Sequence, residues 1–257
     1  ELAAGDLDGD GQLDIIETGG DQGSRIFWYR YPQKDPGVTA NWIKEPTAIG
    51  TLGGDDDLQV GDINNDGAPD VIVSGAPTPS VNGGVSWYAN PRGTAGNVYG
   101  AWTRHIIDDT SEYHDLALGD INADGKLDVV TRGVNETGPT ALYLQGATPD
   151  TWTKVNMINA PSGQGTAIAD IDLDGRKDIV GNGYWLRQPA TGIAIEANWL
   201  KYDFTAWGST TGSAAVHYIN GDGRTDVFLA STESVTPGFA WFENPTDPLT
   251  NPSWTRH

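Results

Sequence analysis

The chain has 257 residues, enough to bury a full core, and a formal net charge of −20 that disfavours binding to nucleic acid or anionic membrane surfaces. It contains no cysteine, which excludes a disulfide scaffold and a Cys-ligated zinc site. No apolar run reaches the ~18 residues of a membrane span, so we expect no membrane insertion.

In chain order, an acidic nine-residue stretch recurs about every 50 residues, a spacing typical of propeller blades. Its copies span residues 6–14, 62–70, 120–128, 170–178 and 218–226. Within a repeat, an alternating stretch such as 115–119 precedes the acidic copy and a β-branched run such as 71–73 follows it. An aromatic stretch such as 27–29 comes next, and then a last stretch with its own Trp, such as 254–256. Four strands per repeat without helical periodicity predict an all-β, five-bladed β-propeller.

We expect this propeller to be one domain over residues 1–257, because no linker or change of composition separates the repeats. The expected blades span approximately residues 1–47, 48–107, 108–158, 159–204 and 205–257. The sequence opens inside an innermost strand and closes in an outermost one, which leaves no residues for closure by strand exchange. The ring then closes by packing alone or with residues before Glu1. A larger propeller with further blades outside this sequence is the structural alternative.

The acidic stretch has the ligand pattern of a calcium-binding loop. Oxygen-bearing side chains stand at positions 1, 3, 5 and 9, Gly at position 6 allows a sharp turn, and position 7 can offer its main-chain carbonyl. An EF-hand shares the side-chain ligands at positions 1, 3 and 5 and the carbonyl at position 7. It ends with Glu at position 12 and lies between two helices, whereas strands flank this stretch. The expected ligands are Asp6, Asp8, Asp10, Gln12 and Asp14; Asp62, Asn64, Asp66, Ala68 and Asp70; Asp120, Asn122, Asp124, Lys126 and Asp128; and Asp170, Asp172, Asp174, Arg176 and Asp178.

The fifth copy, residues 218–226, departs from this pattern. Tyr218 replaces the first carboxylate, while Asn220, Asp222 and Asp226 keep an oxygen-bearing side chain at positions 3, 5 and 9. Losing a ligand lowers both the charge and the coordination number of the site. We therefore expect four Ca²⁺ ions, and a fifth loop that is empty or weakly occupied and serves as a hairpin turn.

These stretches resemble the FG-GAP/VCBS repeats of integrin α-subunits and of many secreted bacterial and fungal propeller proteins. The resemblance covers essentially the whole chain. It implies a β-propeller with calcium in the hairpins between the first and second strands of each blade, and a secreted protein. The flanking sequences at 87–91 and 102–105 are similar to those of extracellular lectin-like propellers and of propellers attached to carbohydrate-active enzymes.

The tryptophans divide into repeated and single positions. Nine recur in two columns and are expected to pack the blades: Trp28, Trp42, Trp87, Trp102, Trp152, Trp185, Trp199, Trp241 and Trp254. Trp207 lies outside both columns, in a loop of small residues that leads into the last innermost strand. With the acidic residues at the start of innermost strands, it suggests a sugar-binding face opposite the calcium loops. The expected ligand-binding residues are Asp57, Tyr113, His114, Asp115 and Trp207.

The sequence favours a secreted calcium-binding propeller that recognises a carbohydrate or glycoconjugate in the manner of a lectin. An enzyme acting on polysaccharide or sugar as a lyase or dehydratase is the alternative, and a protein-binding adhesion module is a third. The enzyme has few acid and base candidates outside the metal loops: His114, His217, Asp115, and Tyr113 or Tyr218. No cluster of basic residues accompanies them to neutralise an acidic substrate, so no catalytic residue is assigned.

Overall fold

The computed structural model of the protein describes residues 1–18, 25–32, 34–45, 49–51, 57–75, 84–94, 96–133, 140–161, 163–209, 211–231 and 238–257. Within these residues the chain forms antiparallel β-sheets, and its helical elements are three short 3₁₀ turns. These turns are η1 (Thr39–Asn41), η2 (Pro91–Thr94) and η3 (Glu196–Asn198). The described part of the chain holds no helix long and apolar enough to cross a membrane. The expectation of an almost purely β protein is confirmed.

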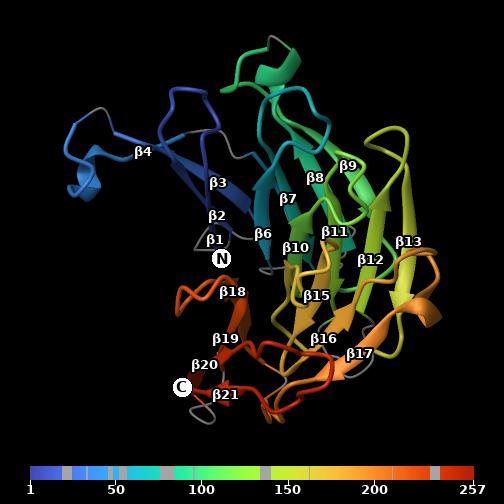
Figure 1. Ribbon diagram of the computed structural model, residues 1–257. Coiled ribbons are helices and arrows are strands. Elements are labelled where there is room, and N and C mark those ends of the chain that lie inside the picture. Colours follow the sequence, from blue (N-terminus) through green and yellow to red (C-terminus); the bar gives the residue numbers. More distant parts are fainter. Residues whose placement is uncertain are drawn as a thin grey trace. The chain divides into compact units, whose positions relative to one another are not determined.

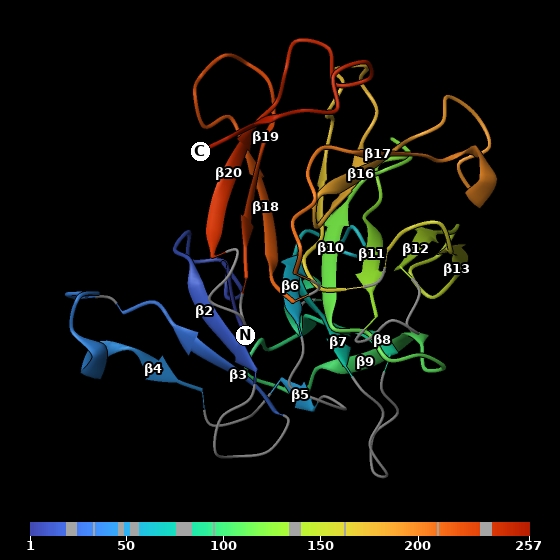
Figure 2. The same cartoon turned by 90° about the horizontal axis from the view of Figure 1, so that it is seen from below.

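The first of two compact units comprises residues 1–114 and 146–151. It contains two sheets; Figure 1 labels their strands except β5, which Figure 2 labels. The first sheet consists of β1 (Leu2–Gly5), β2 (Asp14–Thr18), β3 (Arg25–Arg30) and β4 (Ile43–Lys44), with β5 (Gly50–Thr51) added beside β3. The second sheet consists of β6 (Leu58–Gly61), β7 (Asp70–Gly75), β8 (Gly84–Ala89) and β9 (Thr103–Asp108). Strand β5 lies beyond the approximate blade boundary at residue 47 and still pairs with the first sheet.

The second unit comprises residues 115–145 and 152–257 and contains three four-stranded sheets, whose strands Figure 2 shows from a second direction. The first sheet consists of β10 (Asp115–Gly119), β11 (Asp128–Arg132), β12 (Thr140–Gln145) and β13 (Trp152–Met157). The next consists of β14 (Ala167–Ala169), β15 (Asp178–Gly181), β16 (Tyr184–Arg187) and β17 (Leu200–Asp203). The last consists of β18 (Ser213–His217), β19 (Asp226–Ala230), β20 (Phe239–Glu243) and β21 (Thr255–Arg256).

All five sheets share one register around the acidic loop. The last residue of each first strand pairs with position 9 of the repeat, which is the first residue of the second strand. These pairs are Gly5 with Asp14, Gly61 with Asp70, Gly119 with Asp128, Ala169 with Asp178 and His217 with Asp226. The repeat read from the sequence is therefore one structural unit used five times, and the fifth copy keeps its register despite Tyr218.

Burial is greatest in the middle strands of each sheet. Strands β7, β11, β12 and β15 are buried along their whole length, as their runs of Val, Ile and Leu dictate, whereas the outer strands β4 and β17 are mostly exposed. The first strands approach each other closely: a Cβ on Gly5 would lie 2.5 Å from Cγ1 of Val60 in the neighbouring strand β6. Glycine there lets two blades of the first unit pack.

Most of the repeated tryptophans are buried, as their predicted role in packing the blades requires. Trp28, Trp87, Trp185, Trp102, Trp199 and Trp254 are buried, while Trp42, Trp152 and Trp241 are partly exposed. In the third strands, Trp87 stacks on His105 and Trp241 on His257, with ring centroids 4.1 and 4.0 Å apart. His105 and His257 thus cover their tryptophans at the outer side of two blades.

Candidate metal centres

The acidic loops share one backbone conformation that rests on two left-handed residues. Position 6 is glycine in every copy, with φ between 81° and 86°: Gly11, Gly67, Gly125, Gly175 and Gly223. Position 4 is also left-handed, at Gly9, Asn65, Ala123, Leu173 and Gly221. The role expected for the position-6 glycine is confirmed. The left-handed Ala123 and Leu173 were not foreseen; side chains there strain the backbone, so the loop holds its shape against local preference.

The first carboxylate of each complete loop organises the turn, as the first loop shows. Asp6 accepts hydrogen bonds at Oδ1 from the main-chain N–H groups of Gly9 and Asp10, at 2.7 and 3.0 Å, and at Oδ2 from that of Gly11, at 2.9 Å. Asp62, Asp120 and Asp170 accept the equivalent bonds from positions 5 and 6 of their own loops. Main-chain hydrogen bonds of this kind hold carboxylates in place before any cation binds.

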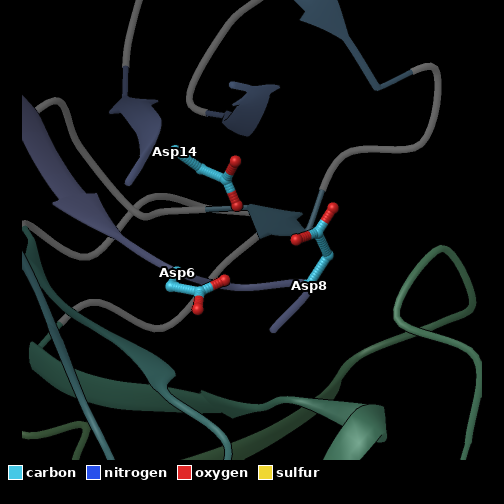
Figure 3. Close-up of side chains that lie close together, drawn as sticks. All are labelled: Asp6, Asp8 and Asp14. Atoms are coloured by element: carbon cyan, nitrogen blue, oxygen red, sulfur yellow. The ribbon is translucent and has the colours of Figure 1, made fainter. Parts of the chain in front are cut away.

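Three carboxylates converge in the first loop. Asp6, Asp8 and Asp14 each place an oxygen within 4.8 Å of the others, and Figure 3 shows the three groups facing a common space. Asp170, Asp172 and Asp174 form a second such group in the fourth loop. The second and third loops have an amide at position 3 in place of one carboxylate, and its oxygen is also a calcium ligand. Hard oxygen donors at this spacing fit Ca²⁺.

Basic side chains lie against several of these carboxylates. Lys126 Nζ is 2.5 Å from Asp124 Oδ2, and Arg176 pairs with Asp174. Arg187, at the end of β16, donates from Nε to Asp172 at 2.5 Å and from Nη2 to Asp174 at 2.9 Å. Sequence reasoning missed Arg187 because it lies outside the repeat. A cation that binds both Asp172 and Asp174 must displace the guanidinium of Arg187.

The residues at position 7 were expected to contribute only their main-chain carbonyls. They are Gln12, Ala68, Lys126 and Arg176, and each donates its main-chain N–H to the position-5 carboxylate of its own loop, at 2.8 to 3.0 Å. This contact places all four residues at the turn. Their service as carbonyl ligands stays a prediction.

Position 9 has a role that the calcium interpretation did not anticipate. All five aspartates there are fully buried: Asp14, Asp70, Asp128, Asp178 and Asp226. Asp178 illustrates their contacts: Oδ2 accepts from the N–H of Ile171 in its own loop, and Oδ1 from the N–H of Gln188 after the third strand, both at 2.9 Å. The other four make the same two kinds of contact. Position 9 therefore joins the loop to the third strand, whatever its part in metal binding.

The residue after the third strand also links neighbouring blades through its side-chain amide. Gln188 Nε2 donates to the carbonyl of Ile121 in the preceding loop at 2.6 Å, and Asn244 Nδ2 to that of Ile171 at 2.8 Å. In the first unit Asn90 Nδ2 donates to the carbonyl of Leu7 at 3.0 Å. Hydrogen bonds thus connect successive acidic loops within each unit. The sequence carries a signal for this link, because an Asn or Gln follows the aromatic stretch in four of the five blades.

The fifth loop keeps the turn without the first carboxylate. Tyr218 is 57% exposed, and its main-chain N–H donates to Nδ1 of His217 at 2.9 Å. Asn220 and Asp222 still accept from the N–H groups two residues further on. The prediction that this loop serves as a hairpin turn is confirmed, and its weak affinity for calcium stays a prediction.

Comparison with known proteins assigns the repeats. The FG-GAP-like repeat family matches residues 6–73 and 62–131, two overlapping segments that each begin at a loop described above. The same loop and register continue through the remaining blades. Residues 6–131 thus belong to the FG-GAP-like repeat family, and the five-blade arrangement supports an FG-GAP β-propeller. Its fold is an all-β, five-bladed propeller, and closure of the ring by packing stays a prediction. No curated protein matches the sequence.

Solved structures share the fold at low sequence identity. The biofilm matrix protein Bap1 of V. cholerae is 15% identical with a TM-score of 0.54, and the match covers 100% of this chain and 38% of that one. A rhamnogalacturonan lyase of Bacillus licheniformis is 16% identical with a TM-score of 0.52, covering 99% and 49%. The exotype rhamnogalacturonan lyase YesX is 14% identical with a TM-score of 0.51, covering 99% and 48%. The FG-GAP chain therefore spans less than half the length of these proteins.

Two of the expected ligand-binding aromatics are unavailable to a ligand. Trp207 is only 5% exposed: its ring packs edge-on against Phe242, with centroids 5.8 Å apart, and beneath the guanidinium of Arg256. Tyr113 is fully buried, and its hydroxyl lies 3.3 Å from Oδ2 of Asp108. The prediction that Trp207 stacks on a sugar and that Tyr113 contacts the ligand is wrong, because both rings complete the packing beneath their loops. Replacing Trp207 by Ala would open a cavity rather than remove a ligand contact.

The remaining candidates on that side are partly buried. Asp57 accepts the main-chain N–H of Leu58 at 2.8 Å, and the carbonyl of His114 accepts from Ser74 Oγ at 3.3 Å. Asp57 and His114 belong to the first unit and Asp115 to the second. Of the loops expected to carry the ligand, residues 53–56, 162 and 210 lie outside the described residues. The assignment of these three residues stays a prediction.

A hollow of about 490 Å³ lies instead among the FG-GAP loops of the second unit. One wall is the start of the third loop, from Asp120 to Ala123, and another is the turn from Gly175 to Lys177 in the fourth loop. The segment after β16, residues 188–193, completes the lining. This volume falls within the range of small-ligand sites. We call it the loop groove.

Burial shifts the pKa of the position-9 carboxyls. Loss of solvation outweighs the two N–H donors and raises the pKa of Asp70 and Asp178 from 3.8 to about 7. The same cause raises the pKa of Asp14 and Asp128 to about 6, and nearby loop carboxylates add to each shift. The folded metal-free chain therefore holds protons at these sites more tightly than the unfolded chain does.

This shift predicts a pH dependence for the metal-free FG-GAP chain. Below about pH 4 these carboxyls are protonated in both states and contribute no difference. As pH rises from about 4 to 7 the unfolded chain ionises first, so the free energy of unfolding falls. Chelated protein should melt at a higher temperature at pH 5 than at pH 8. Because calcium favours the ionised ligands, apparent calcium affinity should rise over the same window. Melting curves and calcium titrations at both pH values check this; a chelated protein that gains stability toward pH 8 contradicts it.

Proposed function

We propose that this chain is a secreted, calcium-binding propeller module that recognises polysaccharide. The calcium part rests on the converging oxygens of the FG-GAP loops, which main-chain hydrogen bonds hold before a cation binds. Loops that are partly exposed suit the high calcium concentration outside cells, where such modules bind at about 10⁻⁴–10⁻³ M. Secretion would expose the loops to that calcium concentration.

The observation that carries polysaccharide recognition is the loop groove. Its lining combines apolar surface from Pro189, Ala190 and Ile193 with polar groups from Asn122, Gln188 and Thr191. Sugar sites need both kinds of surface, because a pyranose ring has apolar C–H faces and a rim of hydroxyl groups. The matched rhamnogalacturonan lyases act on a polysaccharide by name, which supports the same class of ligand for this fold.

The experiment is a binding screen of the purified chain against soluble polysaccharides by affinity electrophoresis, with calcium and with a chelator. We expect retardation by at least one polysaccharide in calcium and its loss on chelation. A Tyr218→Asp variant, which restores the missing carboxylate in a loop away from the groove, is the matched control and should bind as wild type does. Failure of every polysaccharide to retard the calcium-loaded chain would overturn the proposal.

A polysaccharide lyase is the second candidate, favoured by the two lyases among the matched structures. The same polysaccharides, incubated with the chain, would then yield unsaturated sugar products that absorb ultraviolet light. Because the chain spans less than half of those lyases, we expect binding without this product. Formation of the product would establish the enzyme in its place.

A further inference from the structure

The loop groove carries a free positive charge in a strongly acidic protein. Lys177 lies on its wall at the fourth loop, is exposed, and forms no ion pair with the residues that the structure describes. Its neighbour Arg176 is already engaged, since its guanidinium pairs with Asp174 and donates from Nε to the carbonyl of Gln188 at 3.3 Å. The ammonium group of Lys177 is therefore the one cation on the described groove wall that is available to a ligand.

Calcium in the third loop would make the charge on the groove wall more positive. Asp120, on another wall of the groove, accepts the N–H groups of Asp124 and Gly125, and it is the first expected ligand of the third loop. When calcium occupies that loop, the charge of Asp120 is neutralised and a divalent cation stands at the groove. Without calcium the same carboxylate repels anions. Calcium in the third loop would therefore favour an anionic ligand in the groove.

A buried amide adds an unmet hydrogen-bonding group. Gln188 is 4% exposed and lines the groove; its Nε2 donates to Ile121, but its Oε1 has no donor among the described residues. This oxygen is itself covered, so a ligand in the groove meets the polar side chains of Asn122 and Thr191 instead. Apolar Pro189 and Ile193 lie on the same side of the groove.

We propose that the loop groove binds an acidic saccharide, with the carboxylate of a uronic acid residue at Lys177. The apolar part of the segment after β16 contacts a sugar face, and the sugar hydroxyls meet Asn122 and Thr191. This inference rests on the proposed function and names its site and ligand class. It moves ligand binding from the loops that lead into the innermost strands to the calcium loops, opposite to the placement expected from the sequence.

The test compares binding of oligogalacturonate and of a neutral galacto-oligosaccharide by isothermal titration in calcium. Lys177→Gln should weaken oligogalacturonate binding about two- to fivefold, as expected for one exposed ion pair, and Lys177→Glu should weaken it further. Lys201→Gln is the matched control: Lys201 lies in the same unit on the outer strand β17, pairs with Asp203, and is outside the groove. It should bind as wild type does, and all three variants should keep the wild-type melting temperature.

The outcomes separate this inference from the proposed function. Wild-type binding of oligogalacturonate by Lys177→Glu, or equal binding of the neutral sugar, overturns the groove assignment and leaves polysaccharide recognition standing. Absence of binding by the wild-type chain to any polysaccharide overturns both. Loss of binding in Lys177→Glu with retention in Lys201→Gln supports the site.

Discussion

Chelation of calcium should lower the melting temperature of this chain by roughly 20–40 °C, at about 2–4 °C for each kcal/mol lost. A ligand present at 100 times its dissociation constant stabilises the folded state by about 2.7 kcal/mol, so four occupied loops would contribute on the order of 11 kcal/mol. That sum is comparable to the whole stability of a typical domain, about 5–15 kcal/mol. The chelated chain should therefore be close to unfolding at room temperature.

The measurement is thermal unfolding by circular dichroism with calcium, with chelator, and after calcium is restored. Magnesium is the control ion, because it demands near-ideal octahedral geometry and should not replace calcium in these loops. Calcium bound per chain, counted by native mass spectrometry, should be four. A melt indifferent to chelator, or five tightly bound ions, would contradict the ligand set derived from the loops.

The fold could be read from the sequence because its determinants are local and repeated. The glycine at position 6 and the run of β-branched residues after position 9 act within a few residues of each other, and each recurs in register. A pattern present five times identifies a blade even where one copy, such as the loop at Tyr218, is degenerate. The strand register around position 9 follows from the same repetition.

The ligand site could not be read in this way, because it depends on contacts between distant segments. Trp207 looked available in a loop of small residues, but its burial comes from Phe242 and Arg256, which are far along the chain. Arg187 reaches Asp172 only because β16 returns beside the fourth loop. A single unrepeated aromatic residue indicates a unique position, and its packing decides whether that position is surface or core.

Position 9 of the repeat both joins the acidic loop to the third strand and is an expected calcium ligand, so its replacement should cause a large loss of unfolding free energy. Replacing Asp226 by Ala removes the acceptor of the main-chain N–H groups of Ile219 and Asn244, and of a longer bond from that of Asn220. The site is buried and belongs to a loop with no complete calcium ligand set. An unsatisfied buried donor costs about 1–3 kcal/mol, so the variant should lose roughly 2–6 kcal/mol of unfolding free energy. That loss should be the same with calcium and with chelator.

Asp178→Ala is the matched variant, because Asp178 makes the same two kinds of contact in a loop with a complete ligand set. In chelator it should lose as much unfolding free energy as Asp226→Ala does. In calcium it should lose more, by the contribution of one site, about 2.7 kcal/mol at 100-fold excess of calcium over its dissociation constant. Denaturant unfolding of both variants checks this in calcium, and in chelator with a stabilising osmolyte such as sucrose present throughout to restore a folded baseline. If Asp226→Ala were as stable as wild type, position 9 would serve only the metal; if the two variants lost equal stability in calcium, Asp178 would have no share in the metal site.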